Sequence, residues 1–326
     1  MATIKDVANK AGLAVATVSR VMNNRGYISE ETRSRVNEAI KELNYQPNEL
    51  ARSLNKQRND TIGVIVPHIE HPYFAKLISF IEAGAVKLGH KIILCNSGSD
   101  TERELRYIDM CHSNRVAGII LCSASVSVEK LKELNIPIVT IERPENTVTS
   151  GIECDNYEGG RIAAEHLIER GCKRLLIYLG GAESEKIPIE PREAGFMDAC
   201  KAHDVPFICL KHTDREYYAL DYKDWVGSAL QTNRDADGVF ASNDIIAAIV
   251  LKTCAGMGIQ VPDQIKVVGF DDTIISELAT PSITSVRQPV KELAEMAVSF
   301  VDKSRDGEVV PIRTVLPVSL IKREST

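Results

Sequence analysis

The stretch GLAVATVSRVMNNRG, residues 12–26, combines apolar residues at helical spacing with a polar and basic exit. Val18, Val21 and Met22 predict a short helix with one buried face. The residues then left outside this helix or at its rim are Val15, Ala16, Ser19 and Arg20. A helix in a protein core does not need polar and basic residues at its end, whereas a helix that binds a polyanion does.

Two more short helices are predicted on either side of this stretch, over about 3–10 and 30–43. The first two helices are joined by AGL, residues 11–13, the short glycine-containing turn of a helix-turn-helix. Ser29 offers an N-cap for the third helix, ahead of an acidic first turn. We therefore predict a three-helix, helix-turn-helix DNA-binding domain over 1–46. The alternative is a plain amphipathic helical hairpin.

The second helix of such a motif presents its N-terminal residues to base edges in the major groove. Arg20 can bind guanine with two hydrogen bonds, and Val15 and Ala16 can contact thymine methyl groups. Short polar side chains suit phosphate oxygens. The phosphate contacts that we expect are Thr3, Thr17, Ser19, Asn23 and Tyr45.

The charge of the chain is divided unevenly, although its net charge is only −6. Residues 1–59 hold ten Lys and Arg against six Asp and Glu, whereas the remaining residues hold 29 against 39. A basic head on an acidic body predicts that only the head meets nucleic acid.

The composition argues against several other classes of protein. There is no run of 18 apolar residues, and the N-terminus MATIKDVANKAG lacks the apolar region of a secretory signal, so we expect a cytoplasmic protein without membrane contact. The eight cysteines are scattered without a CxxC pair, so we expect neither disulfides nor a metal, and no cofactor. The motifs GxGxxG, HExxH and GxSxG and the phosphate-binding P-loop pattern are absent, so we do not expect an enzyme.

From residue 61 onward, apolar runs alternate with helical segments. The runs that we predict as strands are 61–69, 91–97, 117–124, 136–142, 149–156, 174–181, 207–212, 237–243 and 265–272. Near-continuous apolar strands between helices predict an α/β fold with parallel sheets covered on both faces. We predict two doubly wound halves, about 61–158 and 159–285, with 286–326 returning to the first half.

The pattern TIKDVA…AG…ATVSRVMN…S.ETR..V..AI.ELNYQPN.LARSL, residues 3–54, resembles the head of the LacI-type (lactose-repressor) family of bacterial transcriptional regulators. The match is dense, ordered and nearly gapless. One position departs from it, because most relatives have serine where this chain has Ala14, the expected N-cap of the second helix. Loss of that cap is expected to cost about 1 kcal/mol of local helix stability.

The segment NELARSLNKQRND that follows is too short and too charged to form a stable helix alone. The resemblance implies that residues 47–60 fold on DNA as a paired hinge helix, in which Leu54 wedges into the minor groove beside Arg52 and Asn55. An inserted leucine unstacks a base step and kinks the duplex. Two hinges must meet for this wedge, so we expect a homodimer on a pseudo-palindromic operator. The alternative is an ordinary flexible linker.

The predicted body resembles the sugar-binding body of the same family, which is related in fold to periplasmic solute-binding proteins. Parallel sheets bind ligands beyond the carboxyl ends of their strands, and polar loops follow the predicted strands at 67–74, 155–157, 190–192, 242–244 and 270–272. The positions that match hydrogen-bonding residues of the family are Arg192, Asn243, Asp271 and Gln288. The positions that match residues packing against the effector are Tyr73, Phe74 and Tyr157.

These residue types suit a polyol. Asp271 can accept from adjacent hydroxyls, Arg192 donates a planar fork, and aromatic faces cover apolar C–H surfaces. His71, which we also expect at the effector, would favour an anionic ligand. Each residue has a structural alternative, as core for the aromatic residues and as a cap for the aspartate. An aromatic cluster that could close the cleft or pack between helices consists of Tyr217, Tyr218, Tyr222 and Trp225.

We therefore expect a sequence-specific DNA-binding regulator, a repressor of a carbohydrate-utilisation operon. A small sugar or sugar phosphate bound between the two halves would control its affinity for the operator. A purine or nucleoside is the second choice of effector, because Tyr73, Phe74 and Tyr157 could stack on a planar base. A solute-binding protein for uptake is the alternative from another class, and the basic head argues against it.

Overall fold

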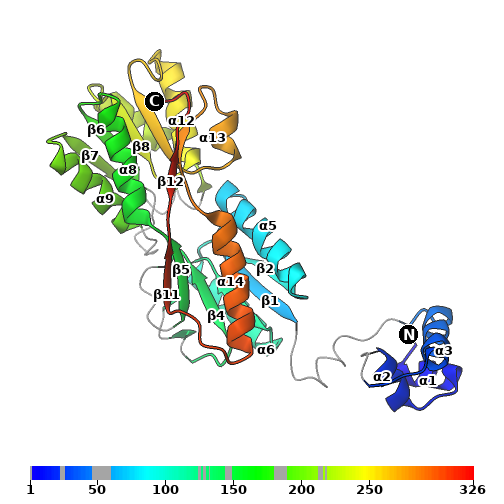
Figure 1. The fold of residues 1–326 in the computed structure, drawn as a ribbon. Coiled ribbons are helices and arrows are strands. Elements are labelled where there is room, and N and C mark those ends of the chain that lie inside the picture. The colour runs from blue at the N-terminus through cyan, green and yellow to red at the C-terminus, as the bar shows by residue number, and fades with distance from the viewer. Residues whose placement is uncertain are drawn as a thin grey trace. The chain divides into compact units, whose positions relative to one another are not determined.

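The computed structural model describes residues 2–22, 26–45, 60–123, 126–127, 130–131, 133–143, 149–179, 189–211, 216 and 219–326. The chain divides into two compact units, a head of residues 1–59 and a body of residues 60–326 (Figure 1). Predicted residues that lie outside the described ranges are Asn23, Arg52, Leu54, Asn55, Tyr217 and Tyr218.

Three short helices form the described part of the head: α1 (Ile4–Ala11), α2 (Val15–Met22) and α3 (Glu30–Glu42). Gly12 adopts φ 63° at the end of α1, a left-handed conformation that favours glycine. Arg35 of α3 donates to the carbonyl of Ala11 at 2.6 Å and so ties the third helix to the turn. The buried core of the head consists of Val7, Ala8, Ala11, Val18, Val21, Val36 and Ala39. The predicted helix-turn-helix is confirmed.

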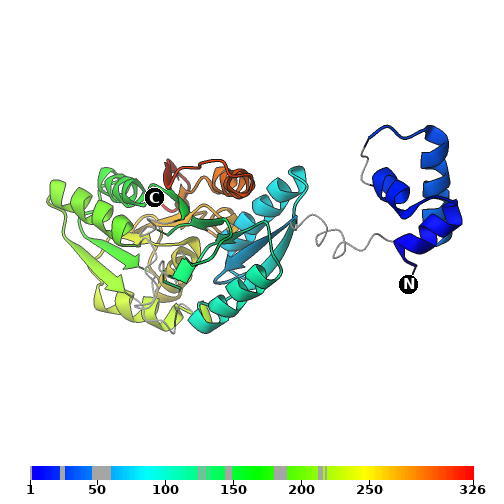
Figure 2. The same cartoon turned by 90° about the horizontal axis from the view of Figure 1, so that it is seen from below.

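The described part of the body contains two six-stranded sheets (Figures 1 and 2). The first sheet has the order β11-β5-β4-β3-β1-β2 and is parallel throughout. Its strands are β1 (Thr61–Val66), β2 (Lys91–Asn96), β3 (Gly118–Leu121), β4 (Ile138–Ile141), β5 (Ser150–Cys154) and β11 (Arg313–Leu316).

The second sheet has the order β12-β10-β9-β8-β6-β7, and within it only β12 runs antiparallel to its neighbour, β10. Its strands are β6 (Leu175–Leu179), β7 (Phe207–Lys211), β8 (Gly238–Ala241), β9 (Lys266–Asp271), β10 (Thr284–Arg287) and β12 (Ser319–Ile321). Asp271 pairs with Arg287 at the carboxyl ends of β9 and β10, so Gln288 emerges beside Asp271.

Helices cover both faces of each sheet, as the continuous apolar strands predict. The first sheet is covered by α5 (Pro72–Lys87) and α14 (Val290–Arg305) on one face and by α6 (Thr101–Ser113) on the other. The second is covered by α8 (Asn156–Glu169) and α9 (Ile189–Ala202) on one face and by α11 (Lys223–Thr232) and α12 (Asp244–Met257) on the other. The short α13 (Ile274–Leu278) follows β9.

All nine predicted strands are present, each somewhat shorter than its apolar run. The path after residue 286 differs from the prediction. Helix α14 and β11 do return to the first half, where α14 lies beside α5 (Figures 1 and 2), but β12 crosses back and pairs with β10. Beyond β12, Ser325 accepts from the backbone N–H of Val267 at 2.9 Å. The crossing depends on backbone hydrogen bonds to the edge of the second sheet. A strand of three residues is too short to show a hydrophobic periodicity, so the sequence could not predict it.

Candidate functional site

Helix α2 buries one face in the head and exposes the other. Val18 and Val21 are buried, whereas Val15, Ala16 and Arg20 are exposed. The three residues that we expect at base edges therefore lie on the accessible face of the helix. Two of the expected phosphate contacts, Thr17 and Ser19, are half-buried at its rim.

Ala14 lies at the start of α2, where an N-cap is expected. Its carbonyl accepts from the backbone N–H groups of Thr17 at 2.9 Å and Val18 at 3.1 Å, as an N-cap carbonyl does. A methyl side chain cannot accept from the helix N–H groups, as a serine hydroxyl would. By contrast, Thr3 caps α1 through a capping box with Asp6, and this hydrogen bonding lowers the pKa of Asp6.

The remaining phosphate contact expected within the described head is Tyr45, which lies three residues beyond α3. It is half-buried, packs against the core of the head, and its N–H donates to the carbonyl of Ile40 at 2.9 Å.

In the body, His71 and Tyr73 lie at the N-terminus of α5, beyond the carboxyl end of β1. His71 is the N-cap, and its Nδ1 accepts from the backbone N–H of Tyr73 at 3.3 Å. Burial lowers the pKa of His71 to about 4, so the ring is neutral near pH 7. His71 therefore does not supply the positive charge that an anionic ligand would need.

Tyr73 is buried, and its hydroxyl has no hydrogen-bond partner among the described residues. Burial raises its pKa, and the nearby carboxylates of Glu142 and Asp271 act in the same direction. Its ring meets that of Phe74 edge-on, with centroids 5.2 Å apart. A buried hydroxyl without a partner is costly, so this hydroxyl is suited to receive a ligand.

Asp271 and Asp272 diverge at the end of β9. Gln288 donates from Nε2 to Asp271 Oδ1 at 2.7 Å, whereas Arg287 and Arg323 donate to the two oxygens of Asp272 at 2.5 and 2.6 Å. Burial raises the pKa of Asp271 well above its ordinary value. Both aspartates have positive φ, 96° and 50°, a strained conformation for residues other than glycine.

Gln288 keeps an open acceptor beside Asp271. Its amide nitrogen faces the Asp271 carboxyl group, and its Oε1 is left buried without a partner among the described residues. The sequence brings Gln288 here because it directly follows β10, which lies next to β9.

Arg192 lies in the first turn of α9 and is buried. Its Nε donates to Asn156 Oδ1 at 2.6 Å and its Nη1 to the carbonyl of Ser242 at 2.8 Å. The guanidinium carbon is 3.5 Å from the centroid of the Phe270 ring, and this cation–π contact holds the guanidinium group over the ring. Arg192 is thus positioned by its neighbours, with further N–H groups available to a ligand.

Two other predicted residues lie at the same edge with part of their hydrogen-bonding capacity in use. Asn243 is the N-cap of α12, and its Oδ1 accepts from the N–H of Ile246 at 2.9 Å. Tyr157 is 42% exposed, and its hydroxyl donates to Asp198 Oδ2 at 3.0 Å.

Of the aromatic cluster, Tyr222 is buried and Trp225 packs edge-on against Tyr178 at 4.9 Å, so these two belong to the core.

Glu142 is a member of the site that the sequence did not single out. It directly follows β4, and its two oxygens accept from Cys154 N at 2.7 Å and from Asn156 Nδ2 at 2.8 Å. Asn156 lies in a polar loop that we noted without giving it a role. The signal that could have found Glu142 is its place after an apolar strand, which it shares with Asp271.

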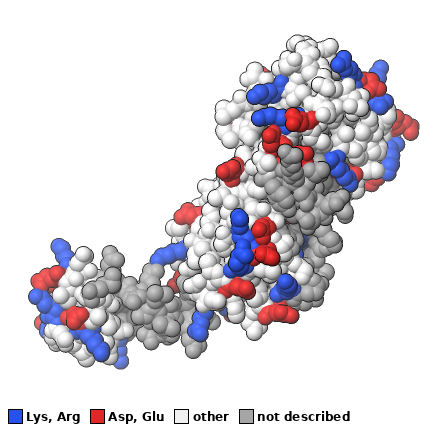
Figure 3. Space-filling view, turned by 180° about the vertical axis from the view of Figure 1, so that it is seen from behind, with Lys and Arg blue, Asp and Glu red and all other residues white. Residues whose placement is uncertain are grey.

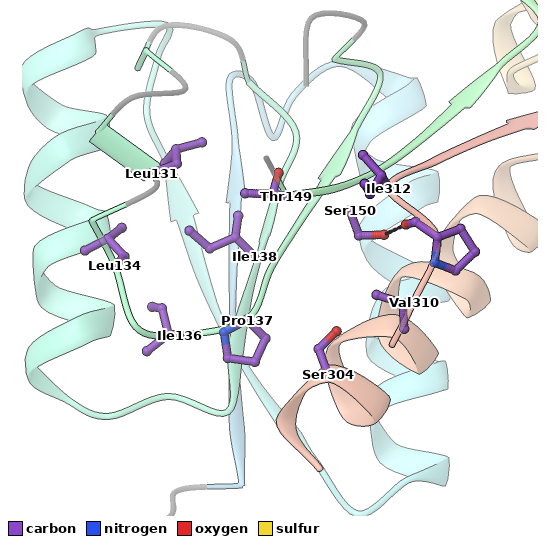
Figure 4. A pocket seen from close by; sticks show the side chains of 11 residues that line it. Leu131, Leu134, Ile136, Pro137, Ile138, Thr149, Ser150, Ser304, Val310 and Ile312 are labelled. Carbon is purple, nitrogen blue, oxygen red and sulfur yellow. Dashed lines mark hydrogen bonds between the residues drawn. The ribbon is translucent and has the colours of Figure 1, made fainter. Parts of the chain in front are cut away.

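A cavity of about 310 Å³ lies elsewhere in the body, at the opposite edge of the first sheet (Figure 4). Its lining precedes or begins β4, β5 and β11, and the Ser150 hydroxyl within it donates to the Pro311 carbonyl at 2.5 Å. The lining residues are Leu131, Leu134, Ile136, Pro137, Ile138, Thr149, Ser150, Ser304, Val310, Pro311 and Ile312. Because unpartnered buried polar groups gather around Asp271 and not here, the polar cluster is the better ligand site.

The described residues contain no group of three or more His, Cys, Asp and Glu side chains placed to hold a metal ion. In the same part of the chain, no helix is long and apolar enough to cross a membrane.

Comparisons with known proteins match the chain in both units. Residues 3–48 match the family described as "Bacterial regulatory proteins, lacI family", and residues 164–326 match "Periplasmic binding protein-like domain". The ribose operon repressor of Halalkalibacterium halodurans is 34% identical over 327 residues, which cover 100% of this chain and 97% of the relative.

Two solved structures are also similar. A periplasmic binding protein/LacI transcriptional regulator from Alkaliphilus metalliredigens in complex with D-xylulofuranose has a TM-score of 0.74 at 33% identity, covering 82% of this chain and 99% of its own. The Lac repressor dimer bound to operator and the anti-inducer ONPF has a TM-score of 0.89 at 25% identity, covering 99% of this chain and 98% of its own.

Proposed function

Because this chain belongs to the LacI family of bacterial regulatory proteins, we propose that it is a repressor of a carbohydrate operon, controlled by a small sugar. The head binds operator DNA in the cytoplasm, and the sugar binds at the polar cluster between the two halves of the body. The observation that carries the sugar assignment is the gathering of Asp271, Gln288, Arg192 and Tyr73 at the carboxyl ends of the strands, with open hydrogen-bonding groups.

DNA recognition is assigned to the exposed face of α2. Arg20 is the base reader with the best hydrogen-bonding capacity, and Val15 and Ala16 present apolar groups beside it. On the body, Figure 3 shows Lys and Arg intermixed with Asp and Glu over the visible face, which is unlike a phosphate-binding stripe. We assign binding to DNA to the head, because residues 1–59 hold ten Lys and Arg against six Asp and Glu, whereas the remaining residues hold 29 against 39.

The sugar acts by binding two states of the protein unequally. In the body, the chain crosses from one sheet to the other several times. Closing the two halves around a ligand must therefore move the strands and helices that connect them. Affinity for the operator changes only by as much as the sugar prefers one arrangement over the other. The body binds its sugar without converting it.

A homodimer is the form that binds the operator. Apolar side chains are exposed at the end of α5 and on β2, namely Val86 at 60%, Leu88 at 48% and Leu94 at 41%. Grouped exposed apolar residues are typical of protein interfaces. A second copy of the chain covering this surface would place two heads on one operator.

The test is selection of DNA sequences from a random duplex library by the full-length protein, followed by a sugar screen on the selected duplex. We expect a two-fold symmetric sequence to be enriched, and its affinity to change with a sugar that also raises the melting temperature of the protein. Recovery of the sugar unaltered after incubation tests the absence of turnover. Failure to enrich any symmetric sequence would contradict the repressor assignment.

A further inference from the structure

Glu142 lies between the two halves of the body and connects them through hydrogen bonds. It follows β4 of the first sheet, and its Oε2 accepts from Asn156 Nδ2 at 2.8 Å. Asn156 begins α8 and in turn accepts from Arg192 Nε at 2.6 Å. Arg192 reaches the carbonyl of Ser242, just after β8 of the second sheet, at 2.8 Å.

The part of this chain of contacts within the second half is rigid. A Cβ added at Gly160 of α8 would lie 2.0 Å from the carbonyl oxygen of Arg192, and one at Gly195 of α9 would lie 2.0 Å from that of Tyr157. The backbones of α8 and α9 are therefore in direct contact, and Asn156 and Arg192 keep a fixed relation. Glu142 is a side chain of the first half that acts on this pair, alongside the backbone carbonyl of Cys154, which accepts from the same Asn156 Nδ2 at 3.1 Å.

Glu142 is held in a costly conformation. Its φ is 56°, in the left-handed region that residues other than glycine rarely adopt. Both oxygens are occupied, because Oε1 accepts from Cys154 N at 2.7 Å while Oε2 accepts from Asn156. Strain of this kind persists where the surroundings require a particular placement, and Asp271 shows the same feature at the end of β9.

The acidic groups around the site disfavour an anion. The carboxyl groups of Glu142 and Asp271 both act on the buried hydroxyl of Tyr73, and the guanidinium of Arg192 acts on both of these carboxyl groups. That guanidinium already donates to two protein oxygens. Two buried polar atoms of the site have no partner among the described residues, the donor Tyr73 OH and the acceptor Gln288 Oε1, and a sugar hydroxyl can both accept and donate.

We propose that Glu142 is a positioning residue, which orients Arg192 through Asn156, and that it makes the site select an uncharged sugar over the phosphate monoester of that sugar. This inference rests on the proposed function, since it concerns the specificity of the same sugar site. It assigns the selectivity to a residue that does not itself have to touch the ligand.

The experiment measures dissociation constants by titration calorimetry on the full-length protein. The probes are D-ribose and D-xylulose, each paired with its 5-phosphate. Glu142→Gln is the test variant, because an amide nitrogen must then face either the N–H of Cys154 or the amide of Asn156, both of which donate. Glu153→Gln is the matched control, since Glu153 is also buried but accepts from Arg313 at 2.5 Å, away from the chain of contacts.

We expect Glu142→Gln to weaken binding of the uncharged sugar by roughly tenfold or more, as for loss of a charge-assisted hydrogen bond. The phosphate ester should lose less or gain affinity, so the preference for the uncharged sugar shrinks. Glu142→Asp should restore part of that preference, because it keeps the charge, and Glu153→Gln should change neither affinity. An unchanged preference in Glu142→Gln would overturn the proposal.

Asn156→Ala keeps the proposal testable if Glu142→Gln does not fold. It breaks the next contact while retaining the Glu142 charge, so both ligands should lose affinity by a similar factor. Unchanged affinities in Asn156→Ala would contradict the proposal. When Glu142→Gln does fold, the two losses should combine in the double variant to less than their product, because they interrupt one chain of contacts. Full multiplication of the losses would contradict it. If the wild-type protein binds none of the sugars, the proposed function fails. If the wild-type protein binds them and Glu142→Gln leaves this binding unaltered, the inference about Glu142 fails and the proposed function stands.

Discussion

Replacing Asp271 and Asp272 one at a time by asparagine tests whether two adjacent carboxylates have separate tasks. Both are buried, at 5% and 4% exposure, and asparagine has nearly the same shape as aspartate. Asp272 accepts from Arg287 at 2.5 Å and from Arg323 at 2.6 Å, whereas Asp271 accepts from the neutral amide of Gln288. We expect Asp272→Asn to lower stability and Asp271→Asn to lower sugar affinity.

The expected magnitudes follow from these partners. Breaking a buried ion pair costs about 3–5 kcal/mol, and we expect about 3 kcal/mol for Asp272→Asn because the Arg287 side chain is 49% exposed and can be rehydrated. For Asp271→Asn we expect no loss of stability, since the amide keeps an acceptor for Gln288 and carries no buried charge. The same variant should lose about 1.5–3 kcal/mol of sugar binding for each charge-assisted hydrogen bond removed.

The pH dependence of stability should also separate the two aspartates. Burial raises the pKa of Asp271 above its ordinary value of 3.8. The stability of the native state therefore falls as the pH rises from 3.8 through the raised pKa, and Asp271→Asn removes this cost. Burial also acts to raise the pKa of Asp272, but hydrogen bonds from Arg287 and Arg323 outweigh it and lower the pKa. Its stabilisation is therefore present above pH 3.8 and is lost as the pH falls through the lowered value.

The chain contains a convenient probe for this measurement. Trp225 is its single tryptophan and packs against Tyr178 in the second half of the body, so its fluorescence follows unfolding of the part that carries both aspartates. Urea midpoints at pH 5 and pH 7 give the stability changes, and calorimetry with the sugar from the screen gives the binding changes. Equal loss of midpoint in the two variants, with sugar affinity retained in Asp271→Asn, would refute the division of tasks.

Four further outcomes can be measured. Arg20→Ala should lose about 1–3 kcal/mol of discrimination between operator and scrambled DNA in a binding titration, and undiminished discrimination would remove α2 from base recognition. Ala14→Ser should stabilise the head by about 0.5–1 kcal/mol in urea denaturation of residues 1–59, and a loss would show that the helix start is misplaced. Leu54→Ala should weaken operator binding more than non-specific binding at one fixed salt concentration, and should reduce the preference for a flexible central base step. If a stiffer central step lowers the operator affinity of wild type and of Leu54→Ala equally, Leu54 does not insert between base pairs. Because burial lowers the pKa of His71 to about 4, the ring protonates only well below neutral pH, so it should add no pH dependence to sugar affinity between pH 6 and 8; a change in the slope of affinity against pH in His71→Gln, measured by calorimetry, would contradict this.

Local periodicity in the sequence was sufficient to predict the three helices of the head and nine strands of the body. The spacing of Val18, Val21 and Met22 predicted α2 and its exposed face, because a helix buries residues three and four apart regardless of what it packs against. The continuous apolar runs predicted nine strands of two covered sheets, because only strands buried on both faces dispense with polar alternation. The strands β10, β11 and β12 were not predicted, because TSVR of β10 and RTVL of β11 mix polar with apolar residues and SLI of β12 has only three residues.

The sequence by itself also determined where the proposed ligand-binding groups gather, since parallel strands bring the polar residues that follow them to one edge of a sheet. The tertiary structure alone decided what each group does there. Asp271 and Asp272 are chemically identical neighbours, and they differ because Arg323, 51 residues further along the chain, reaches only the second of them. Glu142 and Arg192 are joined through Asn156 because helices α8 and α9 pack in direct backbone contact. Such partnerships are set by long-range packing, which has no counterpart in the spacing of residues along the sequence.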